Sequence, residues 1–425
     1  MANSLQTATL ITNEVLRIAH NTSAFLGGRM NTDHDEKWKG KYAPGATVKV
    51  RRPVQFTVRS GATANVQDLT ESTVDLTVQP ELGIDFAVSN FELATAVRND
   101  GSVDKAFKDR YLKPAGLRLA AELDYRIASA LKNAVYNFVG TPGTGPTSIS
   151  DILNAQVPMD NFACPRDGMR YAALSPTANA AVVAGLATLF NDRTALTNQY
   201  KSGVMETSLG LDFVMSQNVP THTVGALGGT PLVNGASQGL VNAGATDNPY
   251  GASTALVTDG WTAAAANRLK AGDVITIAGV NAVNPETKAD TGSLMTFVVT
   301  ADAASDGSGN LTATISPAIV AGGAFQNVTA RPADNAAITV KTGTASTTYA
   351  QNLLWHRDAV TFASPEQELP GGMDMAYQAS LADEGGVSLR FVRGFDITNN
   401  RFISRFDLLY AVAATKPEWM VRRTA

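Results

Sequence analysis

Few residues of this chain have the type and spacing that catalysis or metal binding needs. It contains one cysteine, Cys164, and four histidines, His20, His34, His222 and His356. A transition-metal site needs three or four ligands, which sequences commonly supply as closely spaced pairs of Cys or His. The five residues are scattered, so no such pair occurs among them. The sequence therefore contains no metal motif, and its single cysteine cannot form an intrachain disulfide.

Three polar or glycine-rich segments are predicted to be loops or turns rather than sites. Residues 34–36 (His-Asp-Glu) are the one titratable cluster, and a solvated loop is the favoured interpretation. Residues 143–145 lack the Gly-Lys-Ser/Thr of a phosphate loop. Residues 306–310 lack the ligand spacing and final glutamate of a calcium loop. Cys164 precedes a proline with no histidine nearby, which favours a buried, inert thiol. We therefore expect no catalytic residue, no metal and no cofactor.

The composition indicates a globular chain of more than one domain. Its 425 residues are enough for two or three domains, and a hydrophobic fraction of 44% predicts a sizeable core. A charged fraction of 17% is low and leaves much of the surface for contact with other protein. The net charge of −4 argues against tight binding to many phosphates. The first residues do not resemble a signal peptide, and the most apolar run, residues 181–190, is too short to cross a bilayer.

Alternating apolar and polar residues predict a long two-stranded hairpin. In residues 48–58 only Arg52 breaks the apolar row, and residues 74–78 repeat the alternation. A lone hairpin is marginal in water, and Pro53 suits an edge strand, so this hairpin needs a partner surface. Its charges are segregated along the chain. The candidate interface residues are the bases Lys37, Lys39, Lys41, Arg51, Arg52 and Arg59 and the acids Asp75, Asp85 and Glu92.

Two interpretations of this segregated charge stay open. The strands of one hairpin can neutralise each other, which is the more common use of such charges. Alternatively, the basic strand contacts an acidic surface on a neighbouring copy of the chain, and we favour this for part of it.

Residues 103–139 predict the longest helix. Leu119, Leu123 and Ile127 begin an apolar stripe at four-residue spacing, and Pro114 should kink or restart the helix near Lys113. The turn-rich run after residue 139 ends it. Its polar side has seven bases and four acids, a net charge of 7 − 4 = +3. These are Lys105, Lys108, Arg110, Lys113, Arg118, Arg126 and Lys132 against Asp104, Asp109, Glu122 and Asp124.

Residues 221–346 differ in composition from the rest and predict an inserted β domain. The segment is rich in Gly, Ala, Thr and Asn, with few charges. Short β-like runs occur at 273–280, 294–300, 311–315 and 337–341, separated by turn residues. This pattern is typical of a small β-barrel or sandwich, and we expect it to fold on its own.

Several segments, taken in order, resemble the tailed-bacteriophage major capsid (coat) protein family. Gly45-Ala-Thr-Val and the hairpin around it resemble that family's extended loop, and residues 104–124 resemble the approach to its long spine helix. Residues 210–220 and 352–360 resemble successive pieces of its apical domain, with the insertion between them. Residues 405–418 resemble its last strand, although Ala411 replaces the usual glycine. Leu269-Lys-Ala-Gly-Asp273 resembles the inserted domain of short-tailed phage coat proteins.

The resemblance implies an α+β chain with the tailed-phage and herpesvirus type of capsid fold. Its parts would be an N-terminal arm (1–35), an extended β-hairpin loop (36–80), a peripheral domain with the spine helix (81–140), the first part of the apical domain (141–220), the inserted small β-barrel (221–346), and the apical return with the peripheral C-terminal strands (347–425).

The resemblance also implies partners and a place in the virion. We expect an icosahedral shell of pentamers and hexamers, with a portal protein at one vertex, assembled in the host bacterial cytoplasm. Only about 35 residues precede the loop, so a separate scaffolding protein is expected. In the family the spine helix lines the shell, which makes Lys105, Lys108, Arg118 and Lys132 candidates for weak, non-specific contact with packaged double-stranded DNA. A salt-laced helix face is an equally open interpretation.

Two other functions fit parts of the sequence. An encapsulin-type nanocompartment shell would share the fold but enclose protein cargo, and the length and the insertion argue against it. A β-rich surface or adhesion module would fit residues 221–346, although no secretion signal is recognised. Purified particles that contain DNA rather than an enzyme would exclude the encapsulin, and cell fractionation would test the surface module.

Overall fold

The computed structural model describes residues 11–19, 23–32, 42–53, 56, 58, 61–63, 66, 73–89, 108–146, 148–187, 208–239, 252–372, 375–381 and 386–424. The chain divides into two compact units, which are described separately. The first comprises residues 1–50, 75–127 and 361–413, and the second comprises residues 51–74, 128–360 and 414–425. The content is mixed α and β, with many strands and few helices, as the sequence predicts.

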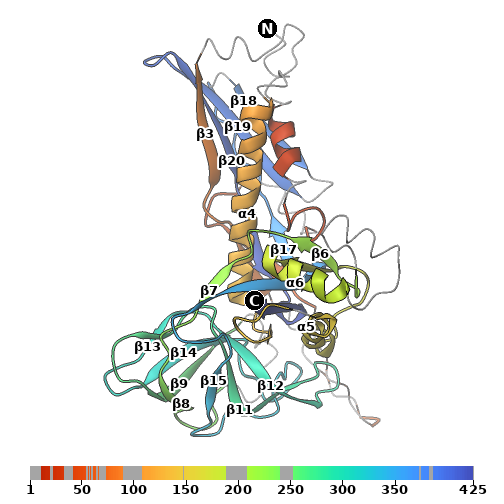
Figure 1. Cartoon of the computed structure of the whole chain (residues 1–425), viewed down its shortest axis with the longest axis vertical. Coiled ribbons are helices and arrows are strands. Elements are labelled where there is room, and N and C mark those ends of the chain that lie inside the picture. The colour runs from red at the N-terminus through yellow and green to blue at the C-terminus, as the bar shows by residue number, and fades with distance from the viewer. Residues whose placement is uncertain are drawn as a thin grey trace. The chain divides into compact units, whose positions relative to one another are not determined.

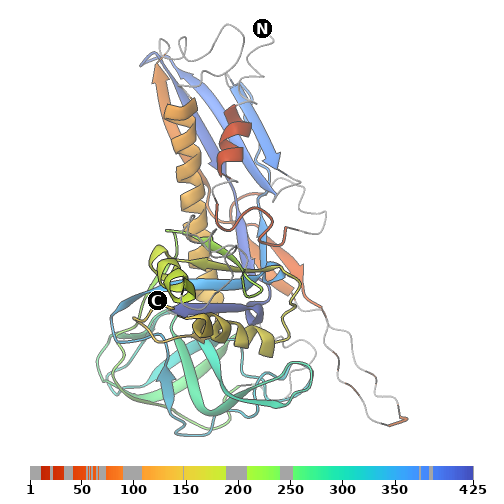
Figure 2. The ribbon, with the colours of Figure 1, turned by 45° about the vertical axis from the view of Figure 1, so that its right-hand side comes forward.

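The first unit combines helices with a four-stranded antiparallel sheet (Figures 1 and 2). Residues 11–19 are helical, and Gly116 lets them pack closely, because a Cβ there would lie 3.1 Å from the Val15 carbonyl oxygen. The long helix α4 (Lys113–Ala134) belongs to this unit as far as Ile127. It follows the π-helical turn η2 (Lys108–Leu112), so the helix restarts at Lys113 as Pro114 predicts. The sheet has the order β18 (Met375–Leu381), β19 (Val387–Asp396), β20 (Arg401–Leu408) and β3 (Leu82–Ser89).

The base of the predicted hairpin forms in the structure. Strand β1 (Thr47–Arg51) pairs with β2 (Thr73–Thr77), and exposure alternates along β1 as its sequence predicts. Leu76, Val78 and Ala411 are buried together beneath Val48 and Val50. Nearby, β17 (Val360–Ala363) pairs with β21 (Ala411–Ala414). This packing supplies the partner surface that the hairpin needs at its base.

The second unit contains a sheet that gathers strands from distant parts of the chain. Its order is β4 (Phe138–Val139), β22 (Met420–Thr424), β16 (Thr348–His356), β5 (Arg170–Leu174) and β6 (Asp212–Met215), and β7 (Thr221–Thr223) also pairs with β16. Helices α5 (Ile149–Asn161) and α6 (Pro176–Ala187) pack on this sheet. The short 3-10 helices η3 (Arg357–Ala359) and η4 (Pro417–Trp419) follow β16 and precede β22.

The predicted inserted domain is a closed β-barrel (Figure 1). Its six strands follow the order β15 (Ile338–Val340), β11 (Val274–Val283), β12 (Asp290–Val299), β14 (Leu311–Ser316), β9 (Thr254–Trp261) and β8 (Gly229–Val233), beside the pair β10 (Asn267–Leu269) and β13 (Ala303–Ala304). The two outer strands meet, since Leu232 bridges Ala337 and the Val233 amide donates to the Ala336 carbonyl at 3.0 Å. Closure leaves no free edge in the sheet.

Two boundaries differ from the expectation. The helix predicted over 103–139 ends at Ala134, because Phe138 and Val139 pair in parallel with Arg422 and Arg423 of β22. The barrel begins at Gly229 rather than at residue 221, because β7 is used to extend the sheet of β16. In both places pairing with a distant strand overrides the local pattern.

Candidate functional site

The predicted interface residues at the hairpin base have different surroundings. Arg51 and Asp75 are exposed, whereas the Arg52 side chain is only 8% exposed and pairs with Glu418 of η4 in the same chain. Burial raises the pKa of the Glu418 carboxyl, and the adjacent Arg52 guanidinium opposes that rise. Arg52, which breaks the apolar row of the strand, therefore has an intramolecular partner.

The acidic candidate Asp85 lies beside a dense charge network in the first unit. Asp407, which is fully buried, accepts from Arg390 Nη2 at 2.7 Å and from Arg405 Nε. Glu81 accepts from Arg405 Nη2 at 2.6 Å. Asp85 is 68% exposed and lies 3.9 Å from Arg405 Nε, at the solvent side of this network. Its carboxylate is accessible to a further cation.

The remaining predicted site residues divide between described and undescribed parts of the chain. Lys108 begins η2, and the Arg118 side chain is 74% exposed, with Nη2 3.5 Å from Glu122. Lys132 is half-buried, and its ammonium donates to the Thr221 carbonyl at 3.0 Å. The other six lie outside the described residues: Lys37, Lys39, Lys41, Arg59, Glu92 and Lys105.

A buried carboxylate, Asp273, joins the two ends of the inserted domain. One oxygen accepts from His222 Nε2 and from Thr342 Oγ1, each at 2.8 Å. The other accepts the amide N–H groups of Gly225 at 3.1 Å and Lys270 at 2.8 Å. Asp273 thereby ties the segment that enters the barrel to the segment that leaves it. These bonds hold the pKa of Asp273 below its usual value although burial opposes them.

Two cations lie beside this carboxylate. Arg422 of β22 is fully buried and donates through Nη1 to the Gly272 carbonyl at 2.8 Å. Burial, together with the neighbouring Arg422 guanidinium, lowers the pKa of Lys132 to about 8. Burial also lowers the pKa of His222, so its ring is neutral at neutral pH. We name this group, Lys132, His222, Asp273 and Arg422, the junction cluster.

Gly272 fits the junction because it has no side chain. Its φ of +99° is a backbone conformation that favours glycine. A Cβ there would lie 2.8 Å from Asn133 Oδ1 and 3.1 Å from the His222 ring. The Lys-Ala-Gly-Asp turn can therefore approach α4 and β7 closely. The sequence marks this turn only through its resemblance to the inserted domain. It gives no local signal for the cluster, because the members of the cluster are distant in the sequence.

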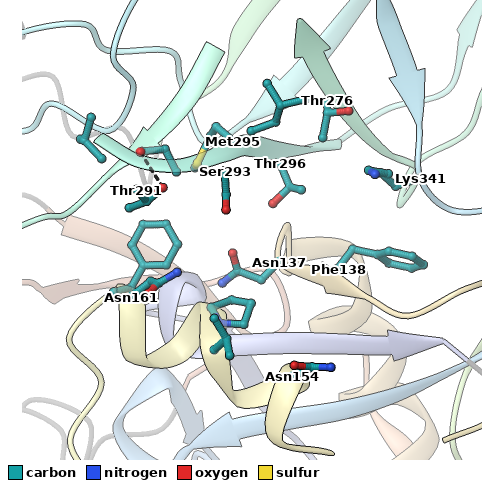
Figure 3. Close-up of a pocket in the computed structure, with 16 residues that line it drawn as sticks. Asn137, Phe138, Asn154, Asn161, Thr276, Thr291, Ser293, Met295, Thr296 and Lys341 are labelled. Atoms are coloured by element: carbon teal, nitrogen blue, oxygen red, sulfur yellow. Dashed lines mark hydrogen bonds between the residues drawn. The ribbon is translucent and has the colours of Figure 1, made fainter. Parts of the chain in front are cut away.

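A cavity of about 490 Å³ lies between α5 and the strands β11 and β12 (Figure 3). Asn137 donates both amide hydrogens to main-chain carbonyls, those of Glu418 at 3.0 Å and Met420 at 2.9 Å. Its carbonyl oxygen consequently points towards Ser293 (Figure 3). Among the lining residues Lys341 alone is titratable. The cavity offers hydrogen bonds and apolar surface but no acid–base pair for catalysis.

The other candidate reactive residues are engaged structurally. The Nδ1 atom of His356 accepts the Asp358 amide at 3.1 Å, which leaves Nε2 to donate to Asp167 at 3.1 Å. Cys164 is buried, and burial raises its pKa to about 12, so it is a thiol at neutral pH. Asp306 caps its own turn by accepting the amides of Ser308 and Asn310, so this segment forms a turn, as predicted.

The described residues contain no arrangement typical of a metal site or of a membrane-spanning helix. No group of three or more His, Cys, Asp or Glu side chains in this part of the chain is arranged to hold a metal ion. Within the same residues, no helix has the length and apolar character needed to span a bilayer.

Comparison with known proteins identifies the family. The family model of the P22 coat protein, gene protein 5, matches residues 30–421. No curated protein matches the chain. A structure from Mycobacterium phage Che8 is 12% identical, with 93% of this chain and 89% of that chain covered and a TM-score of 0.45. The capsid of Ralstonia phage GP4 is 7% identical, with coverage of 96% and 90% and a TM-score of 0.45. The CUS-3 coat protein I-domain is 31% identical, with coverage of 27% and 96% and a TM-score of 0.19.

The family match covers both compact units and the barrel between β7 and β16. It favours a coat protein over an encapsulin-type shell or a surface module. The chain belongs to the P22 coat protein family, and it is a major capsid protein that forms the shell of a phage.

Proposed function

We propose that copies of this chain form pentamers and hexamers that close into an icosahedral shell around double-stranded DNA. The observation that carries this proposal is the family match over residues 30–421. Identical copies related by rotation close into rings when one surface patch fits another, and many weak contacts then stabilise the shell collectively. A scaffolding protein would direct assembly, and a portal protein would occupy one vertex. The chain's own role is structural, without a catalytic step.

We further propose that the hairpin and its charges form part of the contact between copies. Arg51 and Asp75 are exposed at the hairpin base, and Asp85 is exposed beside Arg405. The undescribed candidates Lys37, Lys39, Lys41, Arg59 and Glu92 would belong to the same surface. Arg52 would contribute indirectly, because its buried pair with Glu418 holds the base of the hairpin.

Assembly of the purified chain with its scaffolding protein tests the proposal. Sedimentation velocity should show a large, uniform particle, and electron microscopy should show closed shells. Particles from infected cells should contain double-stranded DNA. A chain that stays monomeric at high concentration with scaffolding protein present would contradict the proposed assembly, and shells filled with a protein cargo would contradict the proposed contents.

A further inference from the structure

The guanidinium of Arg422 is incompletely paired although it is fully buried. Its Nη1 donates to the Gly272 carbonyl, but Nε and Nη2 have no hydrogen-bond partner among the described residues. These two N–H groups share one edge of the guanidinium, the edge that binds carboxylates and other oxyanions through two parallel bonds. A buried cation with an unpaired donor edge is costly, so a compensating group is expected there.

The charge of the junction cluster has the matching sign. At neutral pH Lys132 and Arg422 are cations, Asp273 is the anion and His222 is neutral, which leaves a net charge of 2 − 1 = +1. Asp273 cannot pair with the free edge, because its oxygens already accept four bonds from His222, Thr342, Gly225 and Lys270. The anion that would balance the cluster is therefore not supplied by Asp273.

From this geometry we infer that the free edge of Arg422 and the ammonium of Lys132 form a buried site for one small monovalent anion. The chemical class is a halide or a compact oxyanion such as nitrate or formate, since the site is closed to solvent at Arg422. The bound anion would cancel the excess charge and satisfy Nε and Nη2. It would thereby fasten β22 and α4 to the turn of the inserted domain that contains Gly272 and Asp273.

The experiment is amide hydrogen exchange on the full, unassembled chain at pH 7. Sodium chloride, nitrate or formate replaces sodium gluconate at constant ionic strength, because gluconate is too large for a closed site. Amide hydrogens of the junction exchange when it opens locally. A ligand that binds only the closed form reduces the open population and slows this exchange by a factor of 1 + [L]/Kd. We expect at least about tenfold slower exchange in peptides covering 222–225 and 272–274 at roughly 200 mM small anion. Peptides from β19, in the other unit, should not respond.

Two variants distinguish binding of an anion at the junction cluster from a general effect of salt on exchange. Lys132→Gln reduces the cluster to one cation and one anion, so the response to small anions should disappear. Lys288→Gln is the matched control, because Lys288 is also partly buried with a pKa lowered by burial and donates to main-chain carbonyls, but in another part of the barrel. It should keep the full response. Equal protection in gluconate and chloride, or an undiminished response in Lys132→Gln, would overturn the inference and indicate that water alone satisfies Arg422.

Discussion

His222 Nε2 and Asp273 Oδ1 lie 2.8 Å apart in the interior of the second unit, where both side chains are almost fully buried. His222 belongs to β7, which extends the sheet of β16, whereas Asp273 directly precedes β11 of the barrel. Thr342, where the chain leaves the barrel, donates to the same oxygen. One carboxylate thus joins the inserted domain to the sheet from which it emerges.

Replacing this carboxylate should weaken the junction strongly. Asp273→Asn turns one acceptor into a donor that faces existing donors, so we expect a loss of about 3 kcal/mol in the free energy of unfolding. Urea unfolding of the full chain measures it. Asp302→Asn is the control, since Asp302 accepts from Asn267 and Ala271 but is exposed. Similar losses of unfolding free energy in the two variants would show that the buried carboxylate stabilises the fold no more than an exposed one does.

The stability of the junction should fall as the pH is lowered. Burial lowers the pKa of folded His222, so below its unfolded value of about 6.5 the unfolded chain binds more protons than the folded chain. Folding is therefore disfavoured progressively as the pH falls from 7 towards 5. The advantage of the wild type over His222→Gln should shrink by about 1 kcal/mol over that range. An advantage that is independent of pH would contradict this.

The two neighbouring arginines of the hairpin should respond differently to charge reversal. Arg52→Glu places a second carboxylate against buried Glu418, so we expect a loss of about 3–5 kcal/mol in stability. Reversal at Arg52 should therefore disturb the fold of the monomer itself. Arg51→Glu changes an exposed residue and should alter stability by less than about 0.5 kcal/mol.

Assembly experiments distinguish a loss of monomer stability from a loss of contact between copies. Arg51→Glu should keep the circular dichroism of the monomer but fail to form shells if the hairpin contacts a neighbour. Normal shells from this variant, with wild-type kinetics by light scattering, would remove Arg51 from the proposed interface. Lys49→Glu, two residues earlier on the same exposed row, tests whether the charge of the whole face matters.

Some elements were predictable because the residue pattern of a short segment is enough to indicate them. The stripe from Leu119 to Val135 is buried throughout, and Pro114 marks where α4 begins. The strands β11, β12, β14 and β15 overlap the predicted runs, with ends that differ by up to four residues. In contrast, β8 and β9 were missed, since their sequences are rich in Gly, Thr and Ala without a long alternating row of large residues.

The functional contacts were less predictable because they connect residues far apart in the chain. Arg52 and Glu418 are separated by 366 positions, and Arg422 and Gly272 by 150. Each of these residues looks like an ordinary surface charge or turn in its own segment. Arg52 interrupts an apolar row in the sequence, but only the fold shows that it pairs with Glu418. An interrupted pattern therefore marks a candidate without identifying its partner.

The inserted domain, residues 221–346, should fold by itself as the sequence predicts, but with reduced stability. The barrel closes on its own strands, yet Tyr136 and Phe162 from outside it belong to its buried cluster, and Trp419 packs against that cluster. Losing such aromatic contacts costs about 3 kcal/mol or more. The isolated fragment should give a dispersed amide NMR spectrum and melt below the same barrel in the full chain. A spectrum without dispersion would show that the barrel depends on the rest of the second unit.

The positive charge of α4 is expected to act on the packaged DNA. Residues 103–139 have a net charge of +3 within a chain of −4, and Arg118 is largely exposed. If this helix lines the shell, neutralising Lys105, Lys108 and Arg118 with Gln should leave assembly intact but lower the fraction of DNA-filled particles by about twofold or more, because weak phosphate contacts offset DNA self-repulsion. Lys132 is left unchanged, since its ammonium donates to the Thr221 carbonyl and belongs to the junction cluster.

The alternative is that Glu122, 2.9 Å from Arg126 and 3.5 Å from Arg118, already balances these bases. Glu122→Gln helps to distinguish these interpretations, because it should preserve or improve packaging if the charge of the lumen matters. Equal packaging by the triple Gln variant, by Glu122→Gln and by the wild type would instead establish a helix whose charges pair with one another and have no role towards DNA.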